Sequence, residues 1–420
     1  MSVTGPALSR RLGTVDAVAL GLGSMIGAGI FAAFAPAAAA AGAGLLVGLV
    51  IAAVIAFCNA TSSAQLAAQY PTSGGTYIYG REQLGEWPGF LAGWCFVIGK
   101  TASCAAMALT AAAYAVPEEW AKPVGVAAVL VLATVNCFGV TRTAALTKLI
   151  VVFVLAVLVI VIAVGLPTPA GTVAIGNVLS GGWYGILQSA GLLFFAFAGY
   201  ARIATMGEEV RDPGRTIPRA IIIALSIVLV LYALVAVALV FTLGPVPLAS
   251  SRAPLTDLLA AQGVTAPIPL VRAGAAVAAL GALLALVAGI GRTTLAMARH
   301  SDLPAWLGAV HPRYRVPHHA EIALALVVSV LVLTIDLRGA IGFSSFGVLL
   351  YYFVANVSAF TQQPGNRRYP KALQVLGASG CLVLVATLPP VSIVAGLVVV
   401  AAGVFYRLAR LRRRPARRRD

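Results

Sequence analysis

The sequence has 420 residues, of which 60% are hydrophobic and only 10% are charged. A soluble domain carries about 25% charged residues, so this chain has too little polar surface to cover a globule in water. The formal net charge of +16 would suggest nucleic acid as the partner of a soluble protein. A chain of this composition has the lipid bilayer as its solvent, and we do not expect nucleic acid as a partner.

Apolar runs recur along almost the whole chain. A helix needs about 20 residues to cross roughly 30 Å of hydrocarbon, and its backbone groups must be paired within the segment. The runs are far longer than the roughly 10-residue alternating strands of a membrane barrel. We therefore predict an all-α membrane protein with about twelve transmembrane helices. The expected segments are 12–34, 43–65, 89–116, 123–140, 146–166, 183–206, 217–243, 271–297, 320–335, 340–360, 372–388 and 390–407.

Two of these segments are expected to break. The first carries four glycines in its middle, and each lowers helix stability by about 1 kcal/mol relative to alanine. The sixth carries the run 194–200, Phe-Phe-Ala-Phe-Ala-Gly-Tyr. Broken helices that open each of two five-helix halves indicate an inverted-repeat transporter with its site at the breaks. The alternative is that the small residues only let helices pack closely. The glycines are Gly21, Gly23, Gly27 and Gly29.

Lys100 lies about 17 Å along the third segment, near the bilayer centre. A lysine at that depth is costly and is a functional candidate by default. We hypothesise that Lys100 changes protonation and couples transport to protons, or that it holds a helix break by hydrogen bonds to carbonyls. The alternative is a side chain that reaches a polar crevice and stays charged.

Three acidic residues, Asp16, Glu208 and Glu209, border the ends of the two segments expected to break, near Arg211 and Arg215. We expect that they form an inner gate by exchanging ion pairs. An ordinary solvated loop is the alternative, because exposed pairs are often worth less than about 1 kcal/mol.

The loops follow the positive-inside rule if both termini are cytoplasmic, as expected for a multi-pass protein of the plasma membrane. The basic stretch 407–420 then forms a cytoplasmic tail, and residues 255–261, in the connection 244–272, form a short surface helix outside. The basic residues expected outside are Lys122, Arg252, Arg272 and Arg338.

Signals for a metal centre, a disulfide framework or a catalytic site are weak. The five cysteines include no CxxC pair, and the four histidines cluster in one loop without an HExxH or GxSxG pattern. We therefore expect no cofactor and no metal, and we disfavour a membrane-embedded enzyme. A receptor would not require two breaks, and a channel lacks a repeated pore loop.

Four motifs resemble the amino acid/polyamine/organocation permease superfamily, in the order found there. They are the Gly-rich run 23–31, the Pro-x-x-Gly-Gly-x-Tyr loop in 70–77, the run 194–200 with its continuation to 218, and residues 292–304 followed by 311–317. The greatest similarity is to bacterial relatives of cationic amino acid transporters.

This resemblance implies alternating access around a central site. It implies inverted repeats at 12–166 and 183–360, with a peripheral pair of helices at 372–406. Phe195 is the candidate aromatic that closes over the ligand, with core packing as the alternative. Carbonyls of Phe195, Ala196 and Ala198 would accept from the substrate ammonium group. The amides that would bind the substrate carboxylate are those around Ile26, Gly27, Ala28, Gly29 and Ile30.

The sequence departs from the superfamily pattern at two places. Ala201, followed by Arg202, stands where many relatives carry an acidic residue. We therefore favour a neutral or small amino acid over a cationic amino acid or polyamine, which is the alternative. Apolar Val154 stands where some proton-coupled relatives place a lysine. Lys148 does not fill that position, because it lies about one and a half helical turns before it.

Overall fold

The fold is that of a computed structural model, which describes residues 12–72, 74–139, 144–166, 178–179, 181–207 and 209–412. All regular elements of these residues are helices. Ten helical stretches among them are long and apolar enough to cross a membrane. Two further apolar helices, α15 (His318–Thr334) and α17 (Lys371–Thr387), are 17 residues long. The prediction of an all-α membrane protein with about twelve transmembrane helices is confirmed.

The described residues up to 166 form a first span that is broken into α1 and α2, a long second span, a short helix and three further spans. These are α1 (Thr14–Met25), α2 (Ala28–Ala32), α3 (Phe34–Ala41), η1 (Gly42–Gly44), α4 (Leu45–Gln69), α5 (Thr76–Leu84), α6 (Glu86–Ala115), α7 (Glu118–Cys137) and α8 (Ala144–Gly165).

The described residues after 178 again open with a broken helix. The elements are α9 (Gly182–Phe197), η2 (Ala198–Tyr200), α10 (Ala201–Ala204), α11 (Pro213–Leu243), α12 (Pro245–Ser250), α13 (Pro254–Ala261), α14 (Ile268–Arg299), η3 (Ala305–Gly308), α15, α16 (Leu337–Phe360), η4 (Pro364–Asn366), α17 and α18 (Pro390–Arg412).

Helices α18 and α13 differ from the sequence predictions, the first in where it ends and the second in how deeply it is buried. Helix α18 continues past Arg407 to Arg412, and Arg407 is only 4% exposed because its guanidinium pairs with Asp302. The basic tail therefore begins later than predicted, and residues 413–420 lie outside the described residues. Helix α13 forms where a short helix was expected, but Leu255 and Leu258 on it are fully buried, so it packs into the protein.

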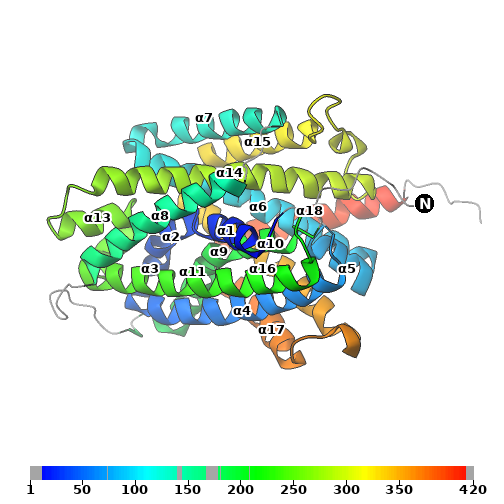
Figure 1. Ribbon diagram of the computed structural model, residues 1–420, viewed down its shortest axis with the longest axis horizontal. Coiled ribbons are helices and arrows are strands. Elements are labelled where there is room, and N and C mark those ends of the chain that lie inside the picture. Colours follow the sequence, from blue (N-terminus) through cyan, green and yellow to red (C-terminus); the bar gives the residue numbers. More distant parts are fainter. Residues whose placement is uncertain are drawn as a thin grey trace, which may run out of the picture.

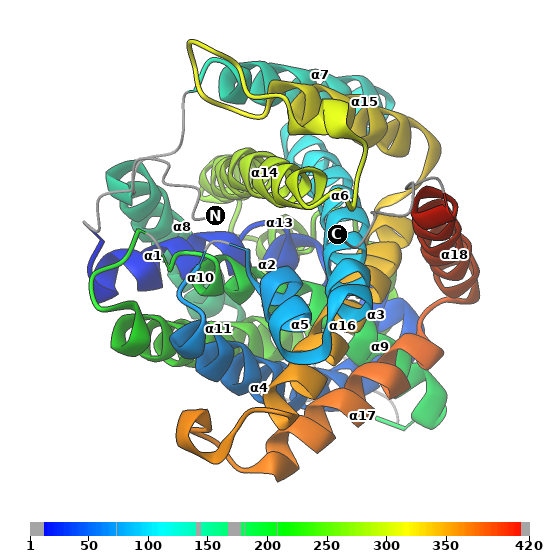
Figure 2. The same ribbon diagram turned by 90° about the vertical axis from the view of Figure 1, so that its right-hand side faces the viewer.

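The long helices run roughly side by side in Figure 1, with α4, α11, α14 and the α7–α15 pair along its horizontal axis. Figure 2 looks along these helices and shows α2 and α10 between them, with α1 at the left-hand edge and α17 and α18 at the periphery. Helix α6 packs against α14 and α16 in the interior. The short segments α2 and α10 are therefore buried between long continuous helices.

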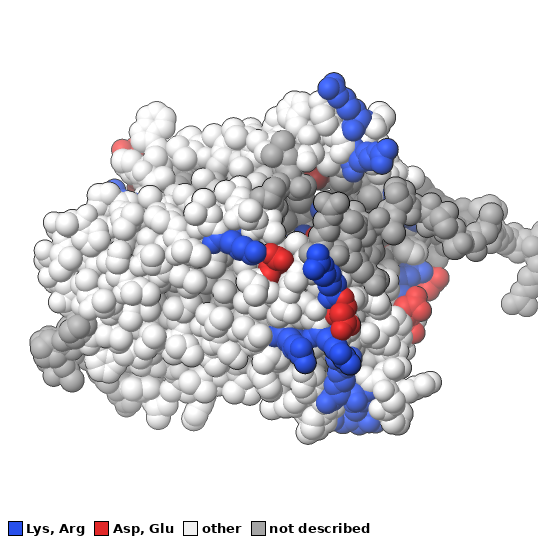
Figure 3. Space-filling model, viewed as in Figure 1, with Lys and Arg blue, Asp and Glu red and all other residues white. Residues whose placement is uncertain are grey.

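Charged side chains are distributed unevenly along the same axis. On the face drawn in Figure 3, most of them lie in the right-hand half, and the left-hand half is almost uncharged. We call the right-hand end of Figure 1, where α5 lies and where α14 and α18 end, the basic end. The end near α13 is the opposite end.

Both segments that were expected to break do so. Helix α1 ends at Met25, Gly27 adopts ψ −124°, and α2 begins at Ala28. Helix α9 ends at Phe197, and the chain tightens into the 3-10 turn η2 before the four-residue helix α10. At the first break the backbone departs from helical geometry, whereas at the second it stays helical and only tightens into a 3-10 turn.

Candidate functional site

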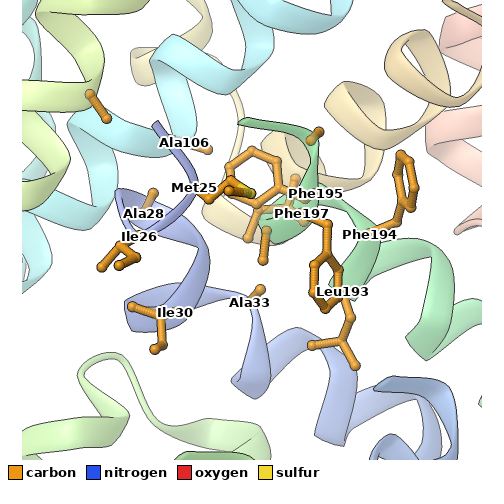
Figure 4. Close-up of a cluster of buried hydrophobic side chains, with 14 of the residues drawn as sticks. Met25, Ile26, Ala28, Ile30, Ala33, Ala106, Leu193, Phe194, Phe195 and Phe197 are labelled. Carbon is orange, nitrogen blue, oxygen red and sulfur yellow. The ribbon is translucent and has the colours of Figure 1, made fainter. Parts of the chain in front are cut away.

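A cavity of about 50 Å³ lies where the two breaks meet. Its walls come from α1 and α2, from α6, from the α9–α10 segment and from α14. The residues that the following argument uses are Ser24, Met25, Gly29, Lys100, Phe195, Ala198, Arg202 and Arg292. Figure 4 shows Met25 beside the ring of Phe195, with Leu193, Phe194 and Phe197 following along the same helix.

The two breaks approach each other through two glycines. A Cβ on Gly29 would lie 2.6 Å from the Cα of Ala196, and a Cβ on Gly199 would lie 2.4 Å from the carbonyl oxygen of Ser24. Real Cβ atoms are not found this close to backbone atoms, so only glycine fits at either position. The crossing therefore depends on one glycine from each broken helix.

The first break leaves backbone donors open. Because α2 starts afresh at Ala28, the amides of its first turn have no partner within the helix. Among the described residues, no acceptor contacts the N–H groups of residues 27–30. Unpaired amides at a helix N-terminus are a binding site for an anionic group.

The second break presents carbonyls that already accept hydrogen bonds. The hydroxyl of Tyr232 donates to the oxygen of Ala196 at 3.0 Å, and the oxygen of Phe195 accepts from the backbone N–H of Ala198. Lys100 Nζ, at 3.1 Å, and the hydroxyl of Tyr352, at 3.3 Å, both donate to the oxygen of Ala198. The carbonyls of Phe195 and Ala196 each keep one further lone pair for a ligand, whereas both lone pairs of Ala198 accept from side chains.

Tyr232 also joins the two breaks directly. Its hydroxyl lies 2.6 Å from the carbonyl oxygen of Met25, in addition to its contact with Ala196. Sequence reasoning missed Tyr232 and Tyr352 as site residues. The only signal for them was a tyrosine in the middle of an apolar segment, where a buried hydroxyl needs a partner.

The predicted binding residues are all buried, but only some of them line the cavity. Gly29, Phe195, Ala198 and Lys100 do. Gly27 instead packs against α14, where a Cβ on it would lie 2.6 Å from that of Ala282. The remaining residues of the set, which are buried without lining the cavity, are Ile26, Ala28, Ile30 and Ala196.

The acidic residues expected at an inner gate have partners other than the nearby arginines of the sequence. Asp16 pairs with Lys148 at 2.5 Å. Glu209 pairs with Arg292 at 3.1 Å and with Arg202 at 3.8 Å. Two of these ion pairs join residues far apart in the chain, because the packed helices bring distant cations close to Asp16 and Glu209. Glu208 lies outside the described residues.

The sequence of this chain matches the amino acid permease family over residues 12–409. The chain belongs to this family. An uncharacterized transporter of Mycobacterium tuberculosis is 57% identical over 415 residues, which cover 98% of this permease and 94% of that protein. The predicted resemblance and the transporter class are therefore confirmed.

Two more distant relatives carry substrate names. The chloroplastic cationic amino acid transporter 7 of Arabidopsis thaliana is 28% identical over 389 residues, 86% of this permease and 66% of that protein. The branched-chain amino acid permease BcaP of Bacillus subtilis is 26% identical over 435 residues, 95% of this permease and 92% of that protein. The names differ in substrate, so they indicate amino acid transport without fixing the amino acid.

Further cavities lie on both sides of the central cavity of the permease. One of about 100 Å³ shares Ser24, Arg202 and Arg292 with it and extends toward Asn136 and Glu209. It therefore continues the central cavity toward the basic end.

The cavity of about 530 Å³ at the opposite end has none of the lining residues of the central cavity. Ala32 lines it, whereas Gly29 lines the central one, so about one turn of α2 separates them. Tyr114 braces this turn, because its hydroxyl donates to the oxygen of Phe31 at 3.0 Å. The central cavity is thus closed toward the opposite end.

Proposed function

We propose that this permease is a secondary active transporter that carries an amino acid across the plasma membrane by alternating access. The observation that carries the proposal is the row of unpaired amides at the start of α2, placed where two broken helices meet at a cavity. Hydrocarbon tolerates such amides only where they face protein, water or a ligand. A substrate carboxylate is the complementary group.

In this mechanism, the amides of residues 27–30 bind the substrate carboxylate, helped by the positive end of α2. The remaining lone pairs at Phe195 and Ala196 accept from the substrate ammonium group, which at Ala198 takes the place of one of the two side-chain donors. Phe195 closes over the ligand from α9. A cavity of about 50 Å³ is smaller than the roughly 300–1,000 Å³ of typical ligand pockets, so the helices move apart when substrate enters.

Access alternates between the two ends of the molecule. The basic end faces the cytoplasm in this proposal, because basic residues gather at cytoplasmic loops. The central cavity already continues toward that end past Glu209, Arg202 and Arg292. The ion pairs of Glu209 and of Asp16 with Lys148 form the inner gate, and rocking of repeats 12–166 and 183–360 opens it.

A cationic substrate is the less favoured alternative. The relative from Arabidopsis is named for cationic amino acids, but here Ala201 lines the cavity without an acidic side chain, and Lys100 and Arg202 line it too. Like charges in such a site repel a cationic side chain. The sequence favours a neutral or small amino acid over a cationic one, but it does not decide between a neutral and an acidic side chain. The name of the relative from Bacillus also argues against a cationic substrate.

A thermal-shift screen of the purified full-length permease against the twenty amino acids and common amines tests the proposal. A ligand that binds only the folded form raises Tm. We expect stabilisation by at least one amino acid, and uptake of the same compound into vesicles that contain the permease. If no amino acid stabilises the protein and none is taken up, the proposal is wrong.

A further inference from the structure

The central cavity carries an excess of positive charge. Three of its lining residues are basic, namely Lys100 from α6, Arg202 from α10 and Arg292 from α14. None of its lining residues is acidic. Within the described part of the chain, Glu209 is the carboxylate that contacts any of these three cations. Glu321 on α15 lies beside Gly291 and also acts electrostatically on Arg292. Two carboxylates for three cations leave the surroundings of the cavity positive.

The carboxylate of Glu209 is not shared equally between Arg202 and Arg292. Glu209 Oε1 lies 3.1 Å from a nitrogen of Arg292 but 3.8 Å from the nearest nitrogen of Arg202. The guanidinium of Arg202 also donates to the hydroxyl of Thr205 at 3.3 Å. Arg202 therefore keeps donors for a further acceptor, and its side chain is 24% exposed, on the wall of the cavity.

Lys100 adds to the imbalance from the other wall. It is 5% exposed, and its Nζ donates to the carbonyl oxygen of Ala198. A carbonyl dipole compensates a buried ammonium group only in part, because it brings no net charge. A negative group in the cavity relieves the repulsion among the three cations more than a neutral group does.

We propose that the preferred substrate is an acidic amino acid, whose side-chain carboxylate binds Arg202. This inference rests on the proposed function and adds the substrate class. A neutral zwitterion brings no net charge to the cavity, whereas an acidic amino acid brings one negative charge. A guanidinium binds a carboxylate through two parallel hydrogen bonds, which gives geometric selectivity as well as charge compensation.

The placement of Arg202 relative to the backbone donors is consistent with this assignment. The amides of α2 lie on one side of the crossing, and Arg202 follows the second break toward the basic end, beside Glu209. A substrate that spans from the amides to Arg202 therefore has one carboxylate at each end and its ammonium group near the carbonyls of α9.

The decisive experiment compares each acid with its own amide. Tm of the purified full-length permease is titrated with L-aspartate, L-asparagine, L-glutamate and L-glutamine at matched pH and ionic strength. Because each acid and amide are almost the same size, the difference reports charge. We expect an acid to produce a given rise in Tm at a concentration about tenfold or more below that of its amide, as for a hydrogen bond to a charged group.

Two variants assign the preference to the cavity. For Arg202→Gln, we expect the acid and its amide to raise Tm at nearly the same concentration, so that the ratio of the two concentrations is close to one. Arg299→Gln, which removes an exposed arginine from the end of α14, is the matched control and should keep the ratio. If Arg202→Gln does not fold, Arg292→Gln provides the same test, because Glu209 is then free to pair with Arg202 and to compensate it.

The outcomes separate this inference from the proposed function. If the amides or other neutral amino acids bind as tightly as the acids, or if both cavity variants keep the preference, the inference is wrong and amino acid transport stands. If no amino acid binds or is transported, both are wrong.

Discussion

The two helix breaks meet at one cavity but expose different backbone groups. At the first break, the amides of residues 27–30 contact no acceptor within the described residues. At the second break, the carbonyls of Phe195, Ala196 and Ala198 each accept at least one hydrogen bond. The side-chain donors to the second break come from three long helices, α6, α11 and α16.

This difference gives the two breaks different roles, because the first can bind a ligand and the second supports the wall of the cavity. Open amides at a helix N-terminus attract an anion, and nothing in the described protein competes for them. Carbonyls that side chains hold in place define the wall against which the ligand lies. The two halves therefore contribute unequally to the site, one with donors for the substrate and one with a braced frame.

The largest effect is expected from a change at the crossing itself. Gly29→Val places a branched side chain where a single Cβ already lies 2.6 Å from the Cα and Cβ of Ala196. Because backbone cannot yield as a flexible side chain does, the helices must separate, at a cost of about 1–3 kcal/mol or more. We expect uptake to be abolished and Tm to fall, measured in proteoliposomes and by thermal unfolding.

Gly365→Ala is the control for that change. A Cβ on Gly365 meets no atom within 4 Å, so stability should stay within about 0.5 kcal/mol and uptake should be unchanged. Normal uptake by Gly29→Val would show that the two breaks do not need their close contact.

An intermediate effect is expected at the brace of the second break. Lys100→Met removes one donor to Ala198 but leaves the hydroxyl of Tyr352 in place. Replacing a buried charge with an apolar side chain of similar size is often neutral for stability. We expect a folded protein whose uptake falls about tenfold, since the donor lost is worth roughly 1.5–3 kcal/mol.

Uptake by Lys100→Met is measured with and without a pH gradient, to separate bracing from proton coupling. Lys122→Met is the matched control, because Lys122 also donates to a carbonyl, that of Leu333 at 2.8 Å, but in an exposed position. Intact accumulation driven by the gradient would remove the coupling role of Lys100. A slower rate with the gradient response preserved would leave only the bracing role.

The sequence was sufficient to predict where the two helices break. Glycines at 27 and 29 and the small residues around Gly199 act locally, since they lower helix stability wherever the chain goes. The central position of Lys100 also followed from counting residues along a helix. These features depend on one segment each.

The partners of the broken segments could not be predicted, because they depend on packing between segments far apart in the chain. Tyr232 lies on α11 and reaches both breaks. Glu209 pairs with Arg292, 83 residues away, while Arg215, close in sequence, pairs with Asp212. Proximity in sequence therefore does not identify the ion-pair partners of the acidic residues.

The smallest effect is expected when the link between the two breaks is removed. Tyr232→Phe deletes the hydroxyl that contacts Met25 and Ala196 but keeps the ring, which packs 5.1 Å from that of Phe197. Unfolding experiments should show a loss of about 1–3 kcal/mol, because buried carbonyls lose a donor. Substrate affinity should change little, since the amides of the first break are untouched.

Tyr352→Phe is the comparison for Tyr232→Phe. It deletes a similar buried hydroxyl, but Lys100 still donates to Ala198, so the loss of stability should be smaller. If Tyr232→Phe instead weakens substrate binding as strongly as Gly29→Val does, the second break contributes directly to binding. The division between a binding break and a supporting break would then have to be given up, because both would contact the ligand with comparable strength.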